Sequence, residues 1–250
     1  MHRPNKKWGQ NFLIDSNVIN KIVDTIEPSD KDTIIEIGPG KGALTIPLSK
    51  KVKKIIAIEI DPILSNELSN KKIKNLKVIN DDFLKFQIDQ IDGPVKFIGN
   101  LPYNITSPII FKILSCLHWE KAIVMVQDEV ADRIVASPNT KAYGRLSVML
   151  QTLSIPRKKF RVSHNCFMPR PKIQSAIIVF KSKKEKIKSI DKFSDMIRLA
   201  FSKRRKMLGN TLGKELDKDL IADFIHKRPE QLSVQDFIDI HERNLLNKIK

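Results

Sequence analysis

Cysteines and long apolar runs are nearly absent from this chain of 250 residues. Its two cysteines, Cys116 and Cys166, are far apart and form no C-x-x-C pair, so we expect neither a disulfide framework nor a zinc knuckle, and no metal site. The most apolar stretch, residues 108–119, is too short for a transmembrane helix and is interrupted by Lys112. The basic residues 1–7 do not lead into an apolar core, so we expect no secretory signal.

Acidic residues are also scarce. Asp and Glu number 28 against 45 Lys and Arg, which gives a formal net charge of +17 and an isoelectric point near 9.8. A large positive charge does not specify a fold, but it favours polyanionic partners. Nucleic acid is the leading candidate and an acidic membrane surface is the second. A lysine-rich composition that only keeps the chain in solution is the alternative explanation.

Short β-branched runs alternate with helical patterns between residues 17 and 127. Apolar residues at helical spacing predict a first helix over residues 18–26, followed by Pro28. Strands are predicted at residues 33–37, 55–60, 77–80, 95–99 and 122–126, with helices over residues 44–50 and from Asp61 onward. This alternation predicts an α/β fold, a doubly wound and mostly parallel sheet with helices on both faces.

The pattern changes in the last third of the chain. Residues 160–166 and 176–180 are predicted as two further strands. Residues 181–188 contain five lysines against one glutamate and are predicted as a solvated linker. The remaining residues have helical patterns. We therefore expect a catalytic domain over residues 1–186 and a small all-helical domain over residues 187–250.

A glycine-rich turn follows the first predicted strand. In open α/β sheets, ligands bind at the carboxyl ends of the strands. Gly38, Gly40 and Gly42 lie at such an end, where glycine permits positive φ and a close approach of a ligand to the backbone. Together with Ala43 the turn also satisfies G-x-G-x-x-A, so a nicotinamide-binding fold stays open as an alternative.

Acidic residues end the next two predicted strands. Glu59 follows Gly38 by 21 residues, a spacing suited to a carboxylate that accepts the hydroxyls of a ribose. Asp82 ends the third strand, where it could accept from an adenine amino group, and adjacent Asp81 could do so instead. The alternatives are a surface glutamate at a strand end and an aspartate that caps a turn.

The most informative motif is Asn100-Leu101-Pro102-Tyr103, directly after the fourth predicted strand. The Asn100 amide oxygen and the Leu101 carbonyl could accept both hydrogens of an exocyclic amine, and Tyr103 could stack on an extruded base. Phe167 is predicted as the second stacking face, with core packing as its alternative. Such a motif has no role in hydride transfer and fits methyl transfer to nitrogen from S-adenosylmethionine.

With these motifs the chain resembles the rRNA adenine dimethyltransferases, and within them the small-subunit (16S) branch. The resemblance extends nearly from end to end and is specific because many separate segments match in order. The matching segments are residues 9–13, 36–40, 99–105, 141–148, 167–172, 200–201 and 204–206.

The resemblance implies a Rossmann-like methyltransferase whose S-adenosylmethionine site is lined by Asn11, Leu13, Gly38, Glu59, Asp82 and Asn100. It implies dimethylation at N6 of two adjacent adenosines in the loop of the 3′-terminal hairpin of 16S rRNA. The implied partners are small-subunit rRNA and an immature small ribosomal subunit. We expect a monomeric, cytoplasmic protein with no membrane partner.

Clustered basic residues are candidates for contact with RNA phosphates. The leading candidate for these contacts is the cluster of Lys203, Arg204, Arg205 and Lys206. The lysines of residues 181–188 form a second cluster, and a solvated charged face is the alternative for both.

Three rival functions use parts of the same pattern. A large-subunit (23S) rRNA adenine methyltransferase of the antibiotic-resistance type shares the glycine turn and residues 10–13, but residues 143–147 favour the small-subunit branch. A non-catalytic RNA-binding assembly factor would not need the intact glycine turn and residues 100–103. A nicotinamide oxidoreductase would rest on fold analogy alone.

Overall fold

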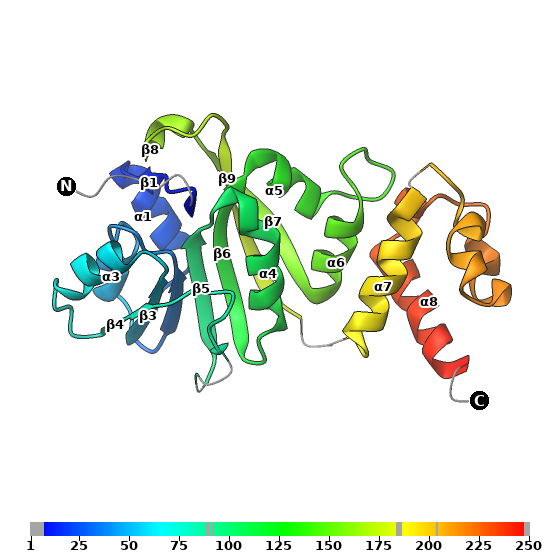
Figure 1. Ribbon diagram of the computed structural model, residues 1–250, viewed down its shortest axis with the longest axis horizontal. Coiled ribbons are helices and arrows are strands. Elements are labelled where there is room, and N and C mark those ends of the chain that lie inside the picture. The colour runs from blue at the N-terminus through cyan, green and yellow to red at the C-terminus, as the bar shows by residue number, and fades with distance from the viewer. Residues whose placement is uncertain (1–7, 89–90, 92, 184–186, 204, 248–250) are drawn as a thin grey trace. The chain divides into compact units, whose positions relative to one another are not determined.

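The structure is a computed structural model, and it describes residues 8–247 apart from 89–90, 92, 184–186 and 204 (Figure 1). The chain divides into two compact units. The first consists of Met1–Ala131 and Arg157–Ser182, and the second of Asp132–Pro156 and Lys183–Lys250. This division differs from the expected domains in two places, since residues 132–156 join the helical unit and that unit resumes at Lys183 rather than at residue 187.

A seven-stranded sheet is the framework of the first unit. Its strand order is β4-β3-β2-β5-β6-β9-β7, with β9 antiparallel to β6 and the five strands from β4 to β6 mutually parallel. The bounds are β2 (Thr33–Ile37), β3 (Lys54–Glu59), β4 (Leu76–Asn80), β5 (Val95–Asn100), β6 (Trp119–Gln127), β7 (Ser154–Val162) and β9 (Ser175–Ser182). The prediction of a mostly parallel, doubly wound sheet is confirmed.

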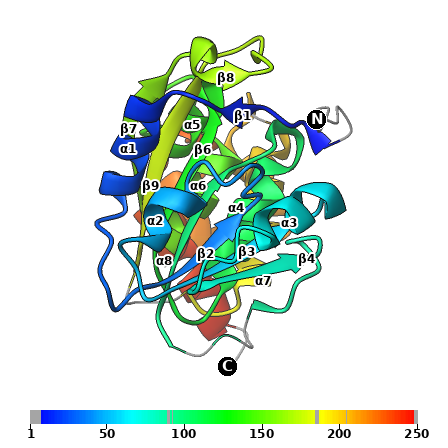
Figure 2. The same ribbon diagram turned by 90° about the vertical axis from the view of Figure 1, so that its left-hand side faces the viewer.

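Helices cover both faces of this sheet, as expected (Figures 1 and 2). They are α1 (Ser16–Thr25), α2 (Thr45–Ser49), α3 (Pro62–Ser69), α4 (Thr106–Ser115) and α5 (Asp128–Val135). Successive residues of a strand point to opposite faces. Ile34 therefore joins the core cluster that contains Ile22 of α1, whereas its neighbour Ile35 is buried on the other face.

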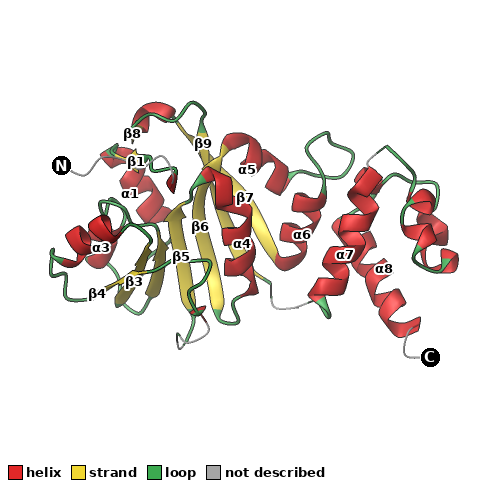
Figure 3. Ribbon diagram, in the orientation of Figure 1, coloured by secondary structure: helices red, strands yellow, loops and turns green. Residues whose placement is uncertain are grey.

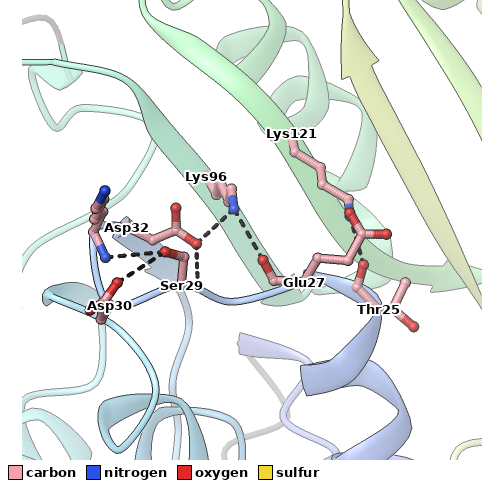
Figure 4. Close-up of polar contacts among 8 residues, drawn as sticks. Thr25, Glu27, Ser29, Asp30, Asp32, Lys96 and Lys121 are labelled. Carbon is pink, nitrogen blue, oxygen red and sulfur yellow. Dashed lines mark hydrogen bonds and ion pairs between the residues drawn. The ribbon is translucent and has the colours of Figure 1, made fainter.

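Two lysines fix the carboxyl end of α1 to the start of the sheet (Figure 4). Lys121 Nζ donates to the Thr25 carbonyl at 2.8 Å and pairs with Glu27 Oε2 at 2.9 Å. Lys96 Nζ donates to the Glu27 carbonyl at 3.2 Å and pairs with Asp32 at 2.6 Å. Cations at a helix carboxyl terminus satisfy its last carbonyls and complement its dipole.

A small second sheet joins the N-terminal segment to the proline-rich loop. Strands β1 (Phe12–Leu13) and β8 (Phe167–Met168) pair antiparallel, with Phe12 opposite Met168 and Leu13 opposite Phe167 (Figure 2). This pairing brings residues far apart in the sequence to the same place, and the sequence patterns did not predict it.

The second unit is built from helices, which Figure 3 shows in red. It contains α6 (Arg145–Leu153), α7 (Ile190–Ala200) and α8 (Val234–Asn247), with short 3-10 turns between α7 and α8. The Tyr143 and Phe201 rings lie 6.4 Å apart, edge to face. Tyr143 and α6 are part of this core, which explains why residues 132–156 join the second unit. No helix in the described ranges is long and apolar enough to cross a lipid bilayer.

Candidate active site

A pocket opens where β2, β3 and β5 end, as expected for a doubly wound sheet. Most of the predicted site residues line it. They are Asn11, Leu13, Gly38, Glu59, Asn100, Leu101 and Tyr103. The lining also includes residues that the sequence patterns did not single out as site residues, among them Gln10, Glu36, Ile60 and Met168.

The glycine turn leaves room for a ligand on one side and for an aromatic ring on the other. Gly38 has a φ of +63°, and a Cβ there would meet no atom within 4 Å, so its backbone is open to the pocket. Gly40 has a φ of +56°, and its Cβ would lie 3.2 Å from the Phe12 ring. The second glycine thus lets the N-terminal segment pack on the turn.

Glu59 is held rigidly at the end of β3. Its Oε2 accepts from the Gly40 backbone N–H and its Oε1 from that of Asp61, each at 2.9 Å. Burial raises the pKa of Glu59, and these hydrogen bonds only partly oppose the shift. Each oxygen keeps a further lone pair, so the carboxylate can also accept the two hydroxyls of a ribose.

Glu36 lies near the end of β2, two residues before Gly38, and lines the pocket, but it was not predicted as a site residue. It is 2% exposed, and its Oε2 has no hydrogen-bond partner within the described part of the chain. Burial raises the pKa of Glu36 to about 7, aided by the nearby charge of Glu59 and opposed by contact with Thr45. An acidic residue inside the apolar run of β2 is the sequence signal that could have identified it.

The predicted catalytic motif, residues 100–103, presents one fixed amide to the pocket. Asn100 Nδ2 donates to the Asn11 carbonyl at 2.8 Å. Only the nitrogen of that amide can donate, so Oδ1 is the atom left to accept from a ligand. The next residue, Leu101, is anchored by its backbone N–H to the Met125 carbonyl at 3.2 Å. Two hydrogen-bond acceptors, Asn100 Oδ1 and the Leu101 carbonyl, thus belong to consecutive residues at the pocket.

Tyr103 is oriented by a hydrogen bond at its far end. Its hydroxyl lies 2.7 Å from Ser175 Oγ of β9, and the residue as a whole is partly exposed. Burial raises the pKa of Tyr103, with the contact to Ser175 opposing the shift. The ring is therefore tied to the sheet while it lines the pocket, an arrangement suited to stacking on a planar ligand.

Two predicted site residues lie off the pocket lining. Asp82 Oδ1 accepts from the Leu84 backbone N–H at 2.9 Å, so it caps a turn, and its contact with an adenine amino group stays a prediction. Phe167 is 1% exposed and belongs to the hydrophobic core, which was its alternative role. Its neighbour Met168, 61% exposed, lines the pocket instead, because successive residues of a strand point to opposite sides.

The predicted RNA-binding cluster lies in the second unit, just after α7. Lys203, Arg205 and Lys206 are exposed there, and the Lys206 backbone N–H donates to the Lys203 carbonyl at 2.8 Å. Arg204 lies outside the described residues, as do residues 184–186 of the predicted linker. Phosphate contact by this cluster stays a prediction.

The fold and the pocket define an S-adenosylmethionine-dependent methyltransferase. Comparison with known proteins gives the family, because residues 1–243 match the ribosomal RNA adenine dimethylases. A ribosomal RNA small subunit methyltransferase A from Wigglesworthia glossinidia brevipalpis is 41% identical, over 99% of this chain and 100% of the relative. The chain belongs to the ribosomal RNA adenine dimethylase family.

Two solved structures are similar over nearly the whole chain. A dimethyladenosine transferase from Plasmodium falciparum has a TM-score of 0.84 and 27% identity, over 95% of this chain and 98% of that one. The 23S rRNA methyltransferase ErmE has a TM-score of 0.72 and 28% identity, over 94% and 99%. Both a dimethyladenosine transferase and a 23S rRNA methyltransferase are therefore similar to this chain in fold.

The pocket fits the cofactor of this family. Glu36 Oε2 is buried and accepts no hydrogen bond from the residues that the structure describes, so it suits an ammonium group, and Glu59 suits a ribose. The open backbone of Gly38 lets a ligand approach between them. These three residues come from the ends of two neighbouring strands, β2 and β3.

Proposed function

We propose that this protein transfers methyl groups from S-adenosylmethionine to N6 of two adjacent adenosines in the loop of the 3′-terminal hairpin of 16S rRNA. Each adenosine is dimethylated, and the reaction belongs to small-subunit biogenesis in the cytoplasm. The observation that carries the proposal is the Asn100 amide, whose nitrogen is held by Asn11 so that its oxygen is left for an amine. The full-length similarity to a small subunit methyltransferase supports the choice of RNA.

The reaction needs a reactive amine more than a reactive methyl group. When bound, S-adenosylmethionine supplies a methyl group that its sulfonium already activates. The adenine amine is a poor nucleophile because its lone pair is delocalised into the ring. Asn100 Oδ1 and the Leu101 carbonyl would accept the two amine hydrogens, draw the nitrogen toward a tetrahedral shape and direct its lone pair. These hydrogen bonds strengthen as positive charge develops on nitrogen, so they favour the transition state.

The remaining steps use few residues. Tyr103 would stack on the extruded adenine and offset part of the cost of unstacking it, roughly 1–3 kcal/mol per base. The alkylated amine is acidic enough to release its proton to water, so no histidine is assigned as a base. After the first methyl transfer a single amine hydrogen remains, and the second transfer needs one acceptor position to tolerate a methyl group.

We assign substrate binding to both parts of the chain. Residues 1–186 would carry the chemistry, and residues 187–250 would contribute phosphate contacts through Lys203, Arg204, Arg205 and Lys206. The exposure of Lys203, Arg205 and Lys206 supports this assignment. The partner would be an immature small ribosomal subunit, bound by one copy of the chain.

The large-subunit alternative is less well supported. ErmE has a lower TM-score than the dimethyladenosine transferase, 0.72 against 0.84, at nearly the same identity. Residues 143–147 also favour the small-subunit branch.

The test is incubation of the protein with small subunits that lack the modification and with labelled cofactor, followed by nucleoside mapping. We expect dimethyladenosine at two adjacent positions in the 3′-terminal hairpin, and far less in the same time with the Asn100→Ala variant. Isolated 23S rRNA, given separately, should stay unlabelled. Label in 23S rRNA alone, or no dimethyladenosine in 16S rRNA, would contradict the proposal.

A further inference from the structure

The segment Trp8–Ile14, here called the N-terminal strap, forms one wall of the pocket. All seven of its residues line the pocket, together with the ends of β2, β3 and β5. Two of its residues form β1, Trp8 lies in a 3-10 turn, and the Ile14 backbone N–H donates to the Cys166 carbonyl at 2.9 Å. Contacts that involve side chains add to these backbone interactions and hold residues 10–12 in place.

One contact joins the strap to the ribose side of the pocket. Gln10 Nε2 donates to Asp61 Oδ2 at 2.9 Å. Asp61 is 1% exposed, and it is fixed in turn, because its Oδ1 accepts from the Ile63 backbone N–H at 3.0 Å as the cap of α3. A hydrogen bond to a buried carboxylate is stronger than one between neutral groups.

The next residues of the strap contact Asn100 and the glycine turn. The Asn11 carbonyl accepts from Asn100 Nδ2 at 2.8 Å, and the Phe12 ring packs on Gly40 with Lys41 Nζ 4.9 Å from its centroid. Gln10 and Asn11 are adjacent in the chain, so a displacement of Gln10 shifts the carbonyl that orients Asn100.

We propose that Gln10 is a positioning residue for the cofactor and for the catalytic amide. Its bond to Asp61 holds the strap closed over the pocket, which slows release of the cofactor, and holds the Asn11 carbonyl where it fixes Asn100. The part that concerns Asn100 rests on the proposed function, whereas the part that concerns cofactor affinity does not.

A charge substitution and its compensating partner test this directly. Gln10→Glu places a second carboxylate against Asp61, so we expect the affinity for S-adenosylmethionine to fall at least tenfold and kcat to fall as well. In the double variant Gln10→Glu, Asp61→Asn the new amide can donate to the new carboxylate while its oxygen still caps α3. We expect the double variant to recover affinity to within about threefold of the natural protein.

Gln235→Glu is the matched control. On α8, Gln235 Nε2 donates to Asp239 Oδ1 at 2.8 Å, so this substitution makes the same charge change at the same kind of pair outside the pocket lining. Cofactor affinity should be unchanged there. Calorimetric titration of S-adenosylmethionine without RNA measures affinity for all variants, and single-turnover methylation of unmodified small subunits measures the chemical step.

Two outcomes would overturn the role of Gln10. One is a Gln10→Glu variant that binds cofactor as tightly as the natural protein. The other is a double variant no better than Gln10→Glu itself. If binding follows the expected pattern but the natural protein forms no dimethyladenosine in 16S rRNA, the proposed substrate is wrong and the positioning of the strap still stands.

Discussion

The Asn100 amide donates to the backbone carbonyl of Asn11 at 2.8 Å, across 89 residues of sequence. An unrestrained asparagine amide could turn over and present either its nitrogen or its oxygen to a substrate. This hydrogen bond selects the oxygen, the atom that a primary amine requires. A segment that also lines the cofactor pocket thus sets the orientation of the proposed catalytic group.

Replacing Asn100 with Ala should therefore impair chemistry far more than binding. We expect the rate of methylation to fall about 10²–10³-fold, the usual cost of removing one preorganised hydrogen-bonding group from an active site. Affinity for RNA should change little, because phosphates supply most of it. Single-turnover methylation and filter binding measure the two quantities. Equal losses in both would mean that Asn100 has only a structural role.

Parts of the fold were predictable where the apolar pattern is dense. The strand predicted at residues 33–37 is β2 (Thr33–Ile37), because a buried parallel strand is a mostly apolar run, here interrupted by Glu36, that the glycine turn ends. The strand predicted at residues 160–166 is instead β7 (Ser154–Val162). It alternates between exposed and half-buried residues, several of them basic, so no apolar run marks its start.

Site residues were predictable where the end of a strand carries a residue type that suits one particular role in ligand binding. Gly38, Glu59 and Asn100 each follow or end a strand, and all three line the pocket. The contacts that assemble the pocket are not local. Neither the pairing of β1 with β8 nor the bond from Gln10 to Asp61 leaves a periodic pattern in the sequence. Nor does the sequence show which of two adjacent strand residues faces a pocket.

Tyr103 allows stacking to be separated from hydrogen bonding. Tyr103→Phe keeps the ring but removes the hydroxyl that lies 2.7 Å from Ser175 Oγ, so we expect a decrease in kcat/KM of less than about tenfold. Tyr103→Ala removes the stacking face, and a loss of roughly 1–3 kcal/mol corresponds to about 5- to 150-fold. Steady-state methylation of small subunits distinguishes them. If Tyr103→Phe were as impaired as Tyr103→Ala, the hydroxyl would matter and stacking would not.

The two lysines that bind the carboxyl end of α1, Lys96 and Lys121, should contribute to the stability of the fold and not to catalysis. Lys96→Met removes a half-buried cation from Asp32 and from the Glu27 carbonyl, which should lower the free energy of unfolding by about 1–3 kcal/mol. Lys51→Met is the control, since the pair of Lys51 with Asp24 is exposed and should contribute less than about 1 kcal/mol. Urea unfolding measures both. Similar losses would show that burial of the Lys96 pair has no effect.

The basic cluster after α7 should make RNA binding depend on salt concentration. Replacing Lys203, Arg205 and Lys206 with Ala should weaken RNA binding and flatten its dependence on salt concentration, by about one unit of log–log slope for each phosphate that the protein no longer neutralises. The control replaces three exposed lysines of the first unit, Lys71, Lys74 and Lys77, with Ala. It removes the same charge and should leave the slope nearly unchanged. If both triple variants flattened the slope equally, net charge rather than this cluster would govern binding.

Glu36 makes both stability and cofactor affinity depend on pH. Burial raises the pKa of Glu36 from its ordinary 4.5 to about 7, so between these values the folded protein keeps a proton that the unfolded chain releases. The contribution of Glu36 to stability is therefore fully present below pH 4.5 and is lost as the pH rises through 7. The loss is about 3 kcal/mol. Glu59, whose pKa is also raised by burial, titrates in the same direction in every variant.

Glu36→Gln should remove this dependence. From pH 5 to pH 8, the free energy of unfolding of the variant without cofactor should rise relative to that of the natural protein. A cofactor ammonium favours the ionised carboxyl, so the affinity of the natural protein for S-adenosylmethionine should increase across the same range while that of Glu36→Gln stays nearly flat. Urea unfolding and calorimetric titration at both pH values measure these changes. Parallel pH profiles for the two proteins would show that Glu36 neither keeps a proton in the folded protein nor interacts with the cofactor ammonium.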